Sequence, residues 1–153
     1  MEIIAIILAA GQGTRLNSAL PKPLHHVGGR PMLAWSLDAA KAAGASRVVT
    51  VLPKDSKTIA TWLGGQESCI QDRPNGTGHA VQAAQNQLAD FQGVALIMFA
   101  DTPLVTAKTL SDLAAAITDG NDIAVLGFET NNPAGYGRLI TGPDQRLEKI
   151  VEN

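Results

Sequence analysis

The sequence contains a single cysteine, Cys69, and so lacks the thiols needed for a disulfide framework. A chain without disulfides fits a reducing compartment, and we expect a cytoplasmic protein. No basic leader with a cleavage site precedes the first apolar run, and no apolar run is long enough to span a bilayer, so neither a signal peptide nor a membrane span is expected. The net charge of −2 gives no electrostatic reason to expect nucleic acid or an anionic membrane as a partner.

The composition favours one folded domain that spans residues 1–153. Hydrophobic residues make up 45% of the chain and charged residues 17%, a balance typical of globular proteins. A chain of this length buries roughly 68–70% of its unfolded surface, which is enough for a substantial core. We find no internal repeat, low-complexity tract or interdomain linker.

Apolar runs alternate with segments of helical spacing along most of the chain. The runs predict strands at 3–9, 47–52, 68–71, 94–99 and 123–128, and shorter β-like runs at 138–141 and 147–151. Helices are predicted between these strands, and their buried faces include Leu33, Ile59, Val81 and Leu110 in turn. Thr77 and Thr106 are predicted to be the N-caps of the last two helices. Alternating strands and helices imply right-handed crossovers, and we expect a three-layer, Rossmann-like α/β fold with a mostly parallel sheet.

The loop after the first strand, LAAGQGTRL at 8–16, has the composition of a phosphate-binding turn. Gly11 and Gly13 allow positive φ and close approach of a ligand to the backbone, and Arg15 offers donors suited to phosphate. A dinucleotide-binding fingerprint would need a third glycine where Leu16 stands, and a Walker loop is absent. A plain turn between a strand and a helix remains the alternative for the Gly-x-Gly pair alone.

A second cation follows closely, because Lys22 stands between two prolines. Proline fixes its own φ and restricts the residue before it, so Lys22 is expected on a stiff loop. A cation held there is more easily explained by a phosphate ligand than by a solvated surface.

Asp101 follows the apolar run at 94–99, at the end of a parallel strand where α/β sheets bind ligands. A carboxylate there suits Mg²⁺ shared with substrate phosphates, although no second carboxylate ligand can be named. The alternative is a capping role, which Thr106 fills better because it lies nearer the next helix. His25 and His26 are interpreted as loop packing, and His79 as a surface or half-buried helix residue rather than a ligand.

The loop at 8–16 and the segment PKPLHHVGGRPM at 21–32 together resemble the signature of the sugar-1-phosphate nucleotidyltransferases. Within that superfamily, four further segments are similar to the N-acetylglucosamine-1-phosphate uridyltransferases: QDRPNGTGHAVQAA, FADTPL, NPAGYGRLI and IVE. These motifs extend over the whole chain in the family's order. Gln12 stands where those enzymes usually carry lysine, which leaves base and sugar specificity open.

The resemblance implies Mg²⁺-dependent transfer of a uridylyl group from UTP to N-acetylglucosamine-1-phosphate, in the supply of cell-wall precursors. It implies catalytic roles for Arg15 and Lys22, Mg²⁺ on Asp101, and sugar contacts by Gly137 and Glu152. The nucleotide would be held by Leu8, Ala9, Ala10, Gly11, Gly13, Thr14, Gln71, Gly76, Thr77, Phe99 and Ala100.

Two other interpretations remain open. One is a nucleotidyltransferase for another base or sugar. The other is a non-catalytic nucleotide-binding fragment, because the family's catalytic domain continues past the position of Asn153 and carries further acceptor contacts and a metal-binding asparagine there. On that ground we expect this chain alone to bind UTP and to release little pyrophosphate.

Overall fold

The computed structural model describes residues 1–11, 13, 16–144 and 146–151. The chain divides into two compact units, Met1–Asp122 and Ile123–Asn153, and each is described by itself. No helix among the described residues combines the length and apolar character needed to cross a membrane.

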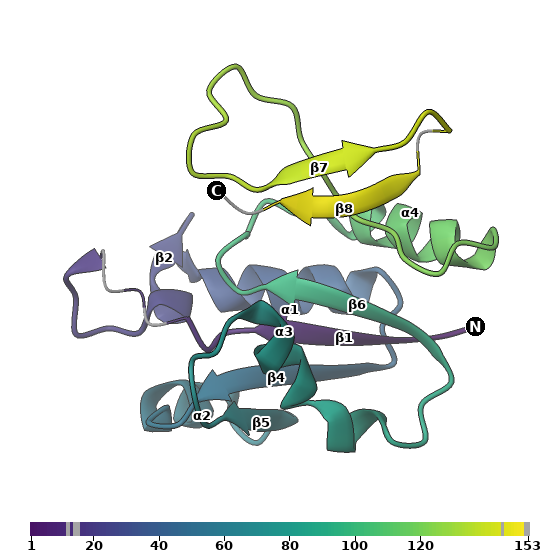
Figure 1. The fold of residues 1–153 in the computed structure, drawn as a ribbon. Coiled ribbons are helices and arrows are strands. Elements are labelled where there is room, and N and C mark those ends of the chain that lie inside the picture. The colour runs from purple at the N-terminus through teal and green to yellow at the C-terminus, as the bar shows by residue number, and fades with distance from the viewer. Residues whose placement is uncertain (12, 14–15, 145, 152–153) are drawn as a thin grey trace. The chain divides into compact units, whose positions relative to one another are not determined.

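The first unit is built on a four-stranded sheet in the order β5-β4-β1-β6 (Figure 1). Its strands are β1 (Glu2–Leu8), β4 (Arg47–Pro53), β5 (Ser68–Gln71) and β6 (Gly93–Phe99), and every neighbouring pair is parallel. Strand β1 lies between β4 and β6, and its residues Ile4–Ile7 are 0% exposed. A continuous apolar run is what a strand buried on both faces requires, so the predicted parallel sheet is confirmed.

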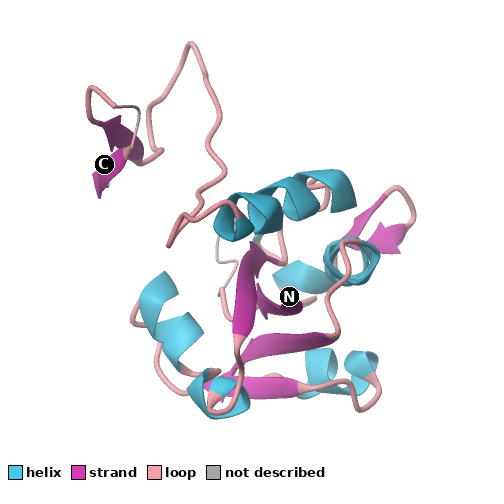
Figure 2. Ribbon diagram, turned by 90° about the vertical axis from the view of Figure 1, so that its right-hand side faces the viewer, coloured by secondary structure: helices cyan, strands magenta, loops and turns pink. Residues whose placement is uncertain are grey.

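Helices cover both faces of this sheet (Figure 2). On one face α1 (Met32–Ala42), α2 (Lys57–Leu63) and α4 (Ala107–Thr118) form one apolar core with alternate residues of β1 and β6 and with Leu52 of β4. On the other face α3 (Thr77–Gln82) and the 3₁₀ helix η3 (Gln85–Leu88) pack against the remaining residues of β1 and β4. A short 3₁₀ helix, η2 (Lys22–Leu24), and a small hairpin of β2 (His26–Val27) and β3 (Arg30–Pro31) lie between β1 and α1. The three-layer α/β prediction is therefore confirmed.

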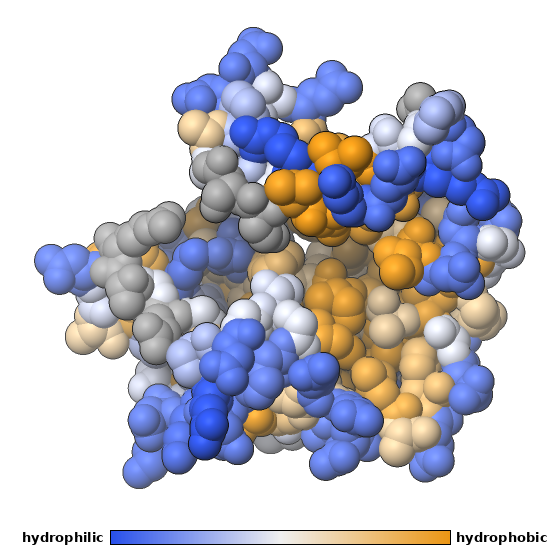
Figure 3. Space-filling model, viewed as in Figure 1, coloured by the Kyte–Doolittle hydropathy of each residue, from blue (hydrophilic) through white to orange (hydrophobic). Residues whose placement is uncertain are grey.

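Strand β6 is less buried than its apolar sequence suggests. It forms an edge of the sheet, and its residues alternate between buried and exposed. Ile97 and Phe99 are 42% and 45% exposed, and Figure 3 shows an apolar surface over this strand. They lie in register with Ile6 and Leu8, on the face where α3 and η3 cover β1 and β4 but not β6. The apolar run that precedes Asp101 is thus buried on one face only.

The two predicted helix caps have different outcomes. Thr106 is the N-cap of α4, and its side chain accepts a hydrogen bond from the backbone N–H of Thr109 at 3.2 Å, as expected. Thr77 is not a cap, because it is the first residue of α3 and Gly76 is the N-cap, without a side-chain hydrogen bond. The helix also ends at Gln82, sooner than the apolar spacing indicated, and continues as the separate turn η3.

In the second unit, β7 (Arg138–Thr141) and β8 (Leu147–Val151) form the antiparallel hairpin that the sequence predicted. The predicted strand at 123–128 is wrong: these residues have no regular structure, and no described strand pairs with them. Their large apolar side chains stay exposed, 77% for Ile123 and 68% for Phe128. β-propensity alone is insufficient without a hydrogen-bonded neighbour. Phe128 instead contacts Tyr136 edge to face, with ring centroids 5.0 Å apart.

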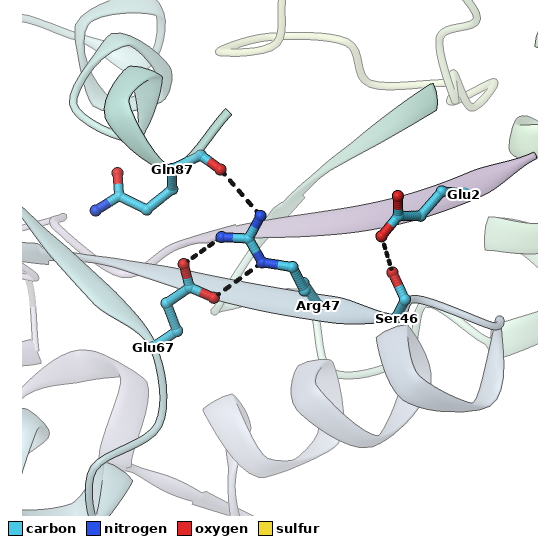
Figure 4. Close-up of polar contacts among 5 residues, drawn as sticks. All are labelled: Glu2, Ser46, Arg47, Glu67 and Gln87. Atoms are coloured by element: carbon cyan, nitrogen blue, oxygen red, sulfur yellow. Dashed lines mark hydrogen bonds and ion pairs between the residues drawn. The ribbon is translucent and has the colours of Figure 1, made fainter. Parts of the chain in front are cut away.

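Polar contacts at the amino end of β4 connect it to the segments beside it (Figure 4). Arg47 donates to both carboxylate oxygens of Glu67, at 2.6 and 3.3 Å, and to the backbone carbonyl of Gln87 at 3.1 Å. The hydrogen bond to Glu67 and its negative charge raise the pKa of Arg47 further. Ser46 donates to Glu2 at 2.9 Å, which joins the start of β1 to the turn before β4.

Candidate functional site

A cleft of about 380 Å³ opens at the carboxyl ends of the parallel strands, within the first unit. This is where open α/β sheets bind ligands. The structure brings together most of the residues that the sequence singled out, from five separate parts of the chain. The predicted residues that line the cleft are Leu8, Ala9, Ala10, Gly11, Gly13, Lys22, Gln71, Gly76, Thr77, Phe99 and Asp101.

The remaining predicted residues lie elsewhere. Ala100 is 2% exposed and is not part of the lining, although its backbone N–H donates to the Leu8 carbonyl at 3.0 Å. Gly137 lies in the second unit, directly before β7. Thr14, Arg15 and Glu152, like Gln12, fall outside the residues that the structure describes.

Three lining residues were missed: Pro23, Pro74 and Ala80. Pro23 could have been found from its place directly after Lys22. Ala80 could have been found because it is a small residue one turn into α3, on the face that packs against the sheet. Pro74 shows no pattern beyond its place in a loop rich in turn residues.

Of the two glycines in the loop after β1, Gly13 has the conformation and surroundings that require glycine. Its φ is +59°, and a Cβ built on it would lie 2.8 Å from Cβ of Lys22. Gly11 is different, because its φ is not positive and a Cβ would meet nothing within 4 Å. The prediction of positive φ is confirmed for Gly13 and wrong for Gly11, where a small residue leaves room in the cleft.

Lys22 forms an ion pair with Asp101, 79 positions further along the chain. Both side chains are about one third exposed, at 35% and 37%. The backbone around Lys22 is well anchored, since Pro23 and Leu24 are buried and the N–H of His25 donates to the Lys22 carbonyl at 3.1 Å. One cation and one carboxylate therefore meet in the cleft, where a phosphate and a metal ion could each compete for one of them.

Gln71 enters the cleft from the end of β5 and is 6% exposed. Its side-chain nitrogen lies 3.2 Å from the carbonyl oxygen of Gly76 and 3.1 Å from Nδ1 of His79. Gly76 has a φ of +90°, a conformation that few residues other than glycine adopt. The loop between β5 and α3 is thus fixed by polar contacts to the same strand end that lines the cleft.

A second hollow, of about 540 Å³, lies beside α1 and residues 103–106. Its charged groups are Arg30 and Asp38, which form an ion pair with each other. Arg30 also lies over the ring of Trp35, 4.6 Å from its centroid, while the Trp35 indole N–H donates to the Val27 carbonyl. Through these contacts Trp35 packs against Arg30 and residue Val27, whereas Lys22 and Asp101 both lie in the smaller cleft.

The sequence of this chain is similar to the sequences of known proteins over nearly its whole length. A "Bifunctional protein GlmU" from Hyphomonas neptunium is 47% identical over 97% of this chain, and one from Maricaulis maris is 51% identical over 97%. The chain spans 33% of the length of each of these relatives.

Solved structures support the fold at lower identity. Rv0371c from Mycobacterium tuberculosis superposes with a TM-score of 0.66 at 22% identity, over 77% of this chain and 61% of that one. Its complex with manganese gives 0.59 at 21% identity, over 78% and 61%. A nucleotidyl transferase from Methanothermobacter gives 0.62 at 20% identity, over 74% and 57%.

The family model described as "MobA-like NTP transferase domain" matches residues 5–148, nearly the whole chain. This match includes both the strands of the sheet and the cleft at their carboxyl ends. The chain therefore belongs to the MobA-like NTP transferase domain family, as its motifs indicated.

Proposed function

We propose that this chain binds UTP in the cleft and provides the nucleotide-binding part of an enzyme that transfers uridylyl to N-acetylglucosamine-1-phosphate. The observation that carries the proposal is the convergence of Gly13, Lys22, Gln71 and Asp101 on one cleft. The motifs that resemble N-acetylglucosamine-1-phosphate uridyltransferases support the choice of substrates. The relatives named GlmU, at 47% and 51% identity, support the same choice.

In the proposed reaction, an oxygen of the sugar phosphate attacks the α-phosphorus of UTP. A new P–O bond forms, the bond from the α-phosphorus to the bridging oxygen breaks, and pyrophosphate leaves with that electron pair. The attacking oxygen is already ionised near neutral pH, so no general base is needed. Positioning and charge neutralisation supply the catalysis. Lys22 would contact the α-phosphate region, and Arg15 is proposed to stabilise the departing pyrophosphate.

Asp101 is the residue proposed to hold Mg²⁺. The described residues contain no group of three or more His, Cys, Asp or Glu side chains placed to hold a metal ion. A single carboxylate fits magnesium nonetheless, because this ion keeps several waters and is bound through one or two carboxylates together with substrate phosphates. Such an ion would neutralise charge on the phosphates. The manganese complex of the structural relative Rv0371c is consistent with a divalent ion in this fold.

The ion pair between Lys22 and Asp101 has a consequence for this proposal. When UTP and Mg²⁺ bind, Lys22 would exchange the carboxylate for phosphate oxygens, and Asp101 would exchange the ammonium for the metal. Both side chains are about one third exposed, so separating them costs little.

Binding and turnover are best measured separately on the 153-residue chain. Calorimetry with UTP, CTP, ATP and GTP in the presence of Mg²⁺ should show the tightest binding for UTP. Pyrophosphate release would then be followed with N-acetylglucosamine-1-phosphate and with glucose-1-phosphate. Binding of UTP without release of pyrophosphate would show that the chain alone binds the nucleotide but does not catalyse the transfer. Tighter binding of CTP, ATP or GTP would show that UTP is not the preferred nucleotide.

Lys22→Ala gives the sharpest internal comparison, with Lys54→Ala as its matched control. Lys54 also follows a proline and is exposed, but it does not line the cleft. We expect Lys22→Ala to weaken UTP binding and Lys54→Ala to leave it unchanged. Equal effects of the two substitutions would remove Lys22 from the site.

A further inference from the structure

The contact between Gln71 and His79 determines which atoms of the glutamine amide remain available to a ligand. Gln71 ends strand β5, and His79 lies on α3, eight positions later. The Gln71 side-chain nitrogen lies 3.2 Å from the Gly76 carbonyl oxygen and 3.1 Å from Nδ1 of His79. Both distances are normal for hydrogen bonds.

The chemistry of the Gly76 carbonyl fixes the orientation of the amide. A carbonyl oxygen only accepts hydrogen bonds, so the Gln71 atom that faces it must be the NH₂ nitrogen. The same nitrogen then donates to His79, and Nδ1 of His79 must accept. A neutral imidazole accepts on one nitrogen and carries its proton on the other, which places the His79 proton on Nε2.

This arrangement uses both N–H groups of the Gln71 amide within the protein. The oxygen Oε1 is the polar atom that remains, and among the described residues no hydrogen bond reaches it. Because Gln71 lines the cleft, Oε1 is available there as a hydrogen-bond acceptor. His79 does not line the cleft and is half-buried behind Gln71, so it acts on a ligand only through the amide.

We propose that His79 is a positioning residue for base selection: it orients Gln71 so that Oε1 accepts a hydrogen bond from the ring N–H of uracil. This inference rests on the proposed function. Uracil has a hydrogen on N3, whereas N3 of cytosine is itself an acceptor and would face Oε1 without a proton between them. Leaving a buried polar group without its partner is the usual source of such discrimination.

The same contacts show which substitution would allow the Gln71 amide to flip. Without His79, one N–H of Gln71 loses its acceptor and only the Gly76 carbonyl opposes a flip of the amide. A flipped amide presents donors to the base and suits cytosine better than uracil. Asparagine at position 79 restores an acceptor close to the place of Nδ1, because its Oδ1 is attached at the same distance from Cβ.

The test compares the dissociation constants of UTP and CTP for the parent chain, His79→Ala and His79→Asn by calorimetry. We expect the preference for UTP over CTP to fall about five- to tenfold in His79→Ala, the value of one hydrogen bond. His79→Asn should keep most of the preference. In the background of Gln71→Ala, removing His79 should change the preference no further, because the two residues act as a unit.

A second measurement does not depend on the nucleotide. The nitrogen chemical shifts of the His79 ring, measured by NMR, should show a protonated Nε2 and an unprotonated Nδ1 near neutral pH. A proton on Nδ1, or an unchanged base preference in His79→Ala, would overturn the inference. A parent chain that binds UTP and CTP equally would overturn the proposed base preference and the selection role with it, while the expected His79 tautomer would still support the contact with Gln71.

Discussion

The two units of the chain differ in where their apolar side chains lie. In the first unit, residues Ile4–Ile7 of β1 are completely buried between helices on both faces of the sheet. In the second unit, every residue of β8 is exposed, and Ile150 is 51% exposed. An isolated two-stranded hairpin is at best marginally stable, whereas a sheet with helices on both faces carries its own core. Stability and the nucleotide cleft should therefore both depend on Met1–Asp122.

The largest expected effect comes from the core. Leu33 on α1 is 0% exposed, and Leu33→Ala should lower the free energy of unfolding by about 2–5 kcal/mol through lost burial and a cavity. Leu147 in the second unit is 40% exposed, and the same truncation there should change it by less than about 0.5 kcal/mol. Urea denaturation of both variants measures the difference. An equal loss would show that the two units are packed equally well.

The second prediction concerns glycines with positive φ. Gly13→Val should abolish detectable UTP binding, because a Cβ would approach Lys22 at 2.8 Å and the side chain would enter the cleft. Gly135→Val is the matched control in the second unit, since Gly135 has a φ of +81° and nothing within 4 Å of a Cβ. Calorimetry should find UTP affinity unchanged in the control. If both variants lose binding, the nucleotide site is not confined to the first unit.

A smaller effect is expected for metal binding without nucleotide. Removing Lys22 leaves the Asp101 carboxylate without its cation, so Lys22→Ala should bind Mn²⁺ alone about two- to fivefold more tightly than the parent. The same variant should bind UTP more weakly. Lys149→Ala makes the same change of net charge in the second unit and should alter neither constant. Electron paramagnetic resonance of free Mn²⁺ gives the affinity, and unchanged Mn²⁺ binding in Lys22→Ala would place the metal away from Asp101.

The smallest effect is the pH dependence contributed by Cys69, the sole cysteine, which lies in the first unit. Burial, and then the negative charge of Glu67, raises the pKa of this thiol above its ordinary value of 9.0. The folded chain therefore keeps the thiol proton to higher pH than the unfolded chain, and stability falls as pH rises past that value. Urea denaturation between pH 8 and pH 10 should show a steeper fall in the parent than in Cys69→Ala. Parallel curves would mean that the thiol titrates alike in both states.

Much of the first unit could be predicted from the sequence because its signals are local. The strand at 68–71 was predicted with the bounds that the structure has, and the Thr106 cap needed only a hydroxyl before a helical run. Lys22 and Asp101 could each be singled out from neighbouring residues. Their pairing could not, since it depends on how strands far apart in sequence are arranged side by side.

The features that could not be predicted from the sequence depend on tertiary contacts. One face of β6 is exposed because α3 and η3 cover β1 and β4 but do not reach this edge strand, and its apolar sequence does not encode that. The residues at 123–128 have strand composition but no paired strand among the described residues. His79 is a half-buried residue of α3, as expected, but its contact with Gln71 could not be predicted from the sequence.

The parallel arrangement of the sheet also sets the order in which the cleft can form during synthesis. Lys22 and Asp101 are 79 positions apart, so at about 5–20 residues per second the ribosome adds Asp101 roughly 4–16 s after Lys22. Until then β1 lacks its neighbour β6. Gly11, Gly13 and Lys22 then lack Phe99 and Asp101, which complete the lining of the cleft. Non-local strand pairing of this kind also slows folding. Acquisition of ligand binding by nascent chains would therefore mark the moment when the edge strand joins the sheet.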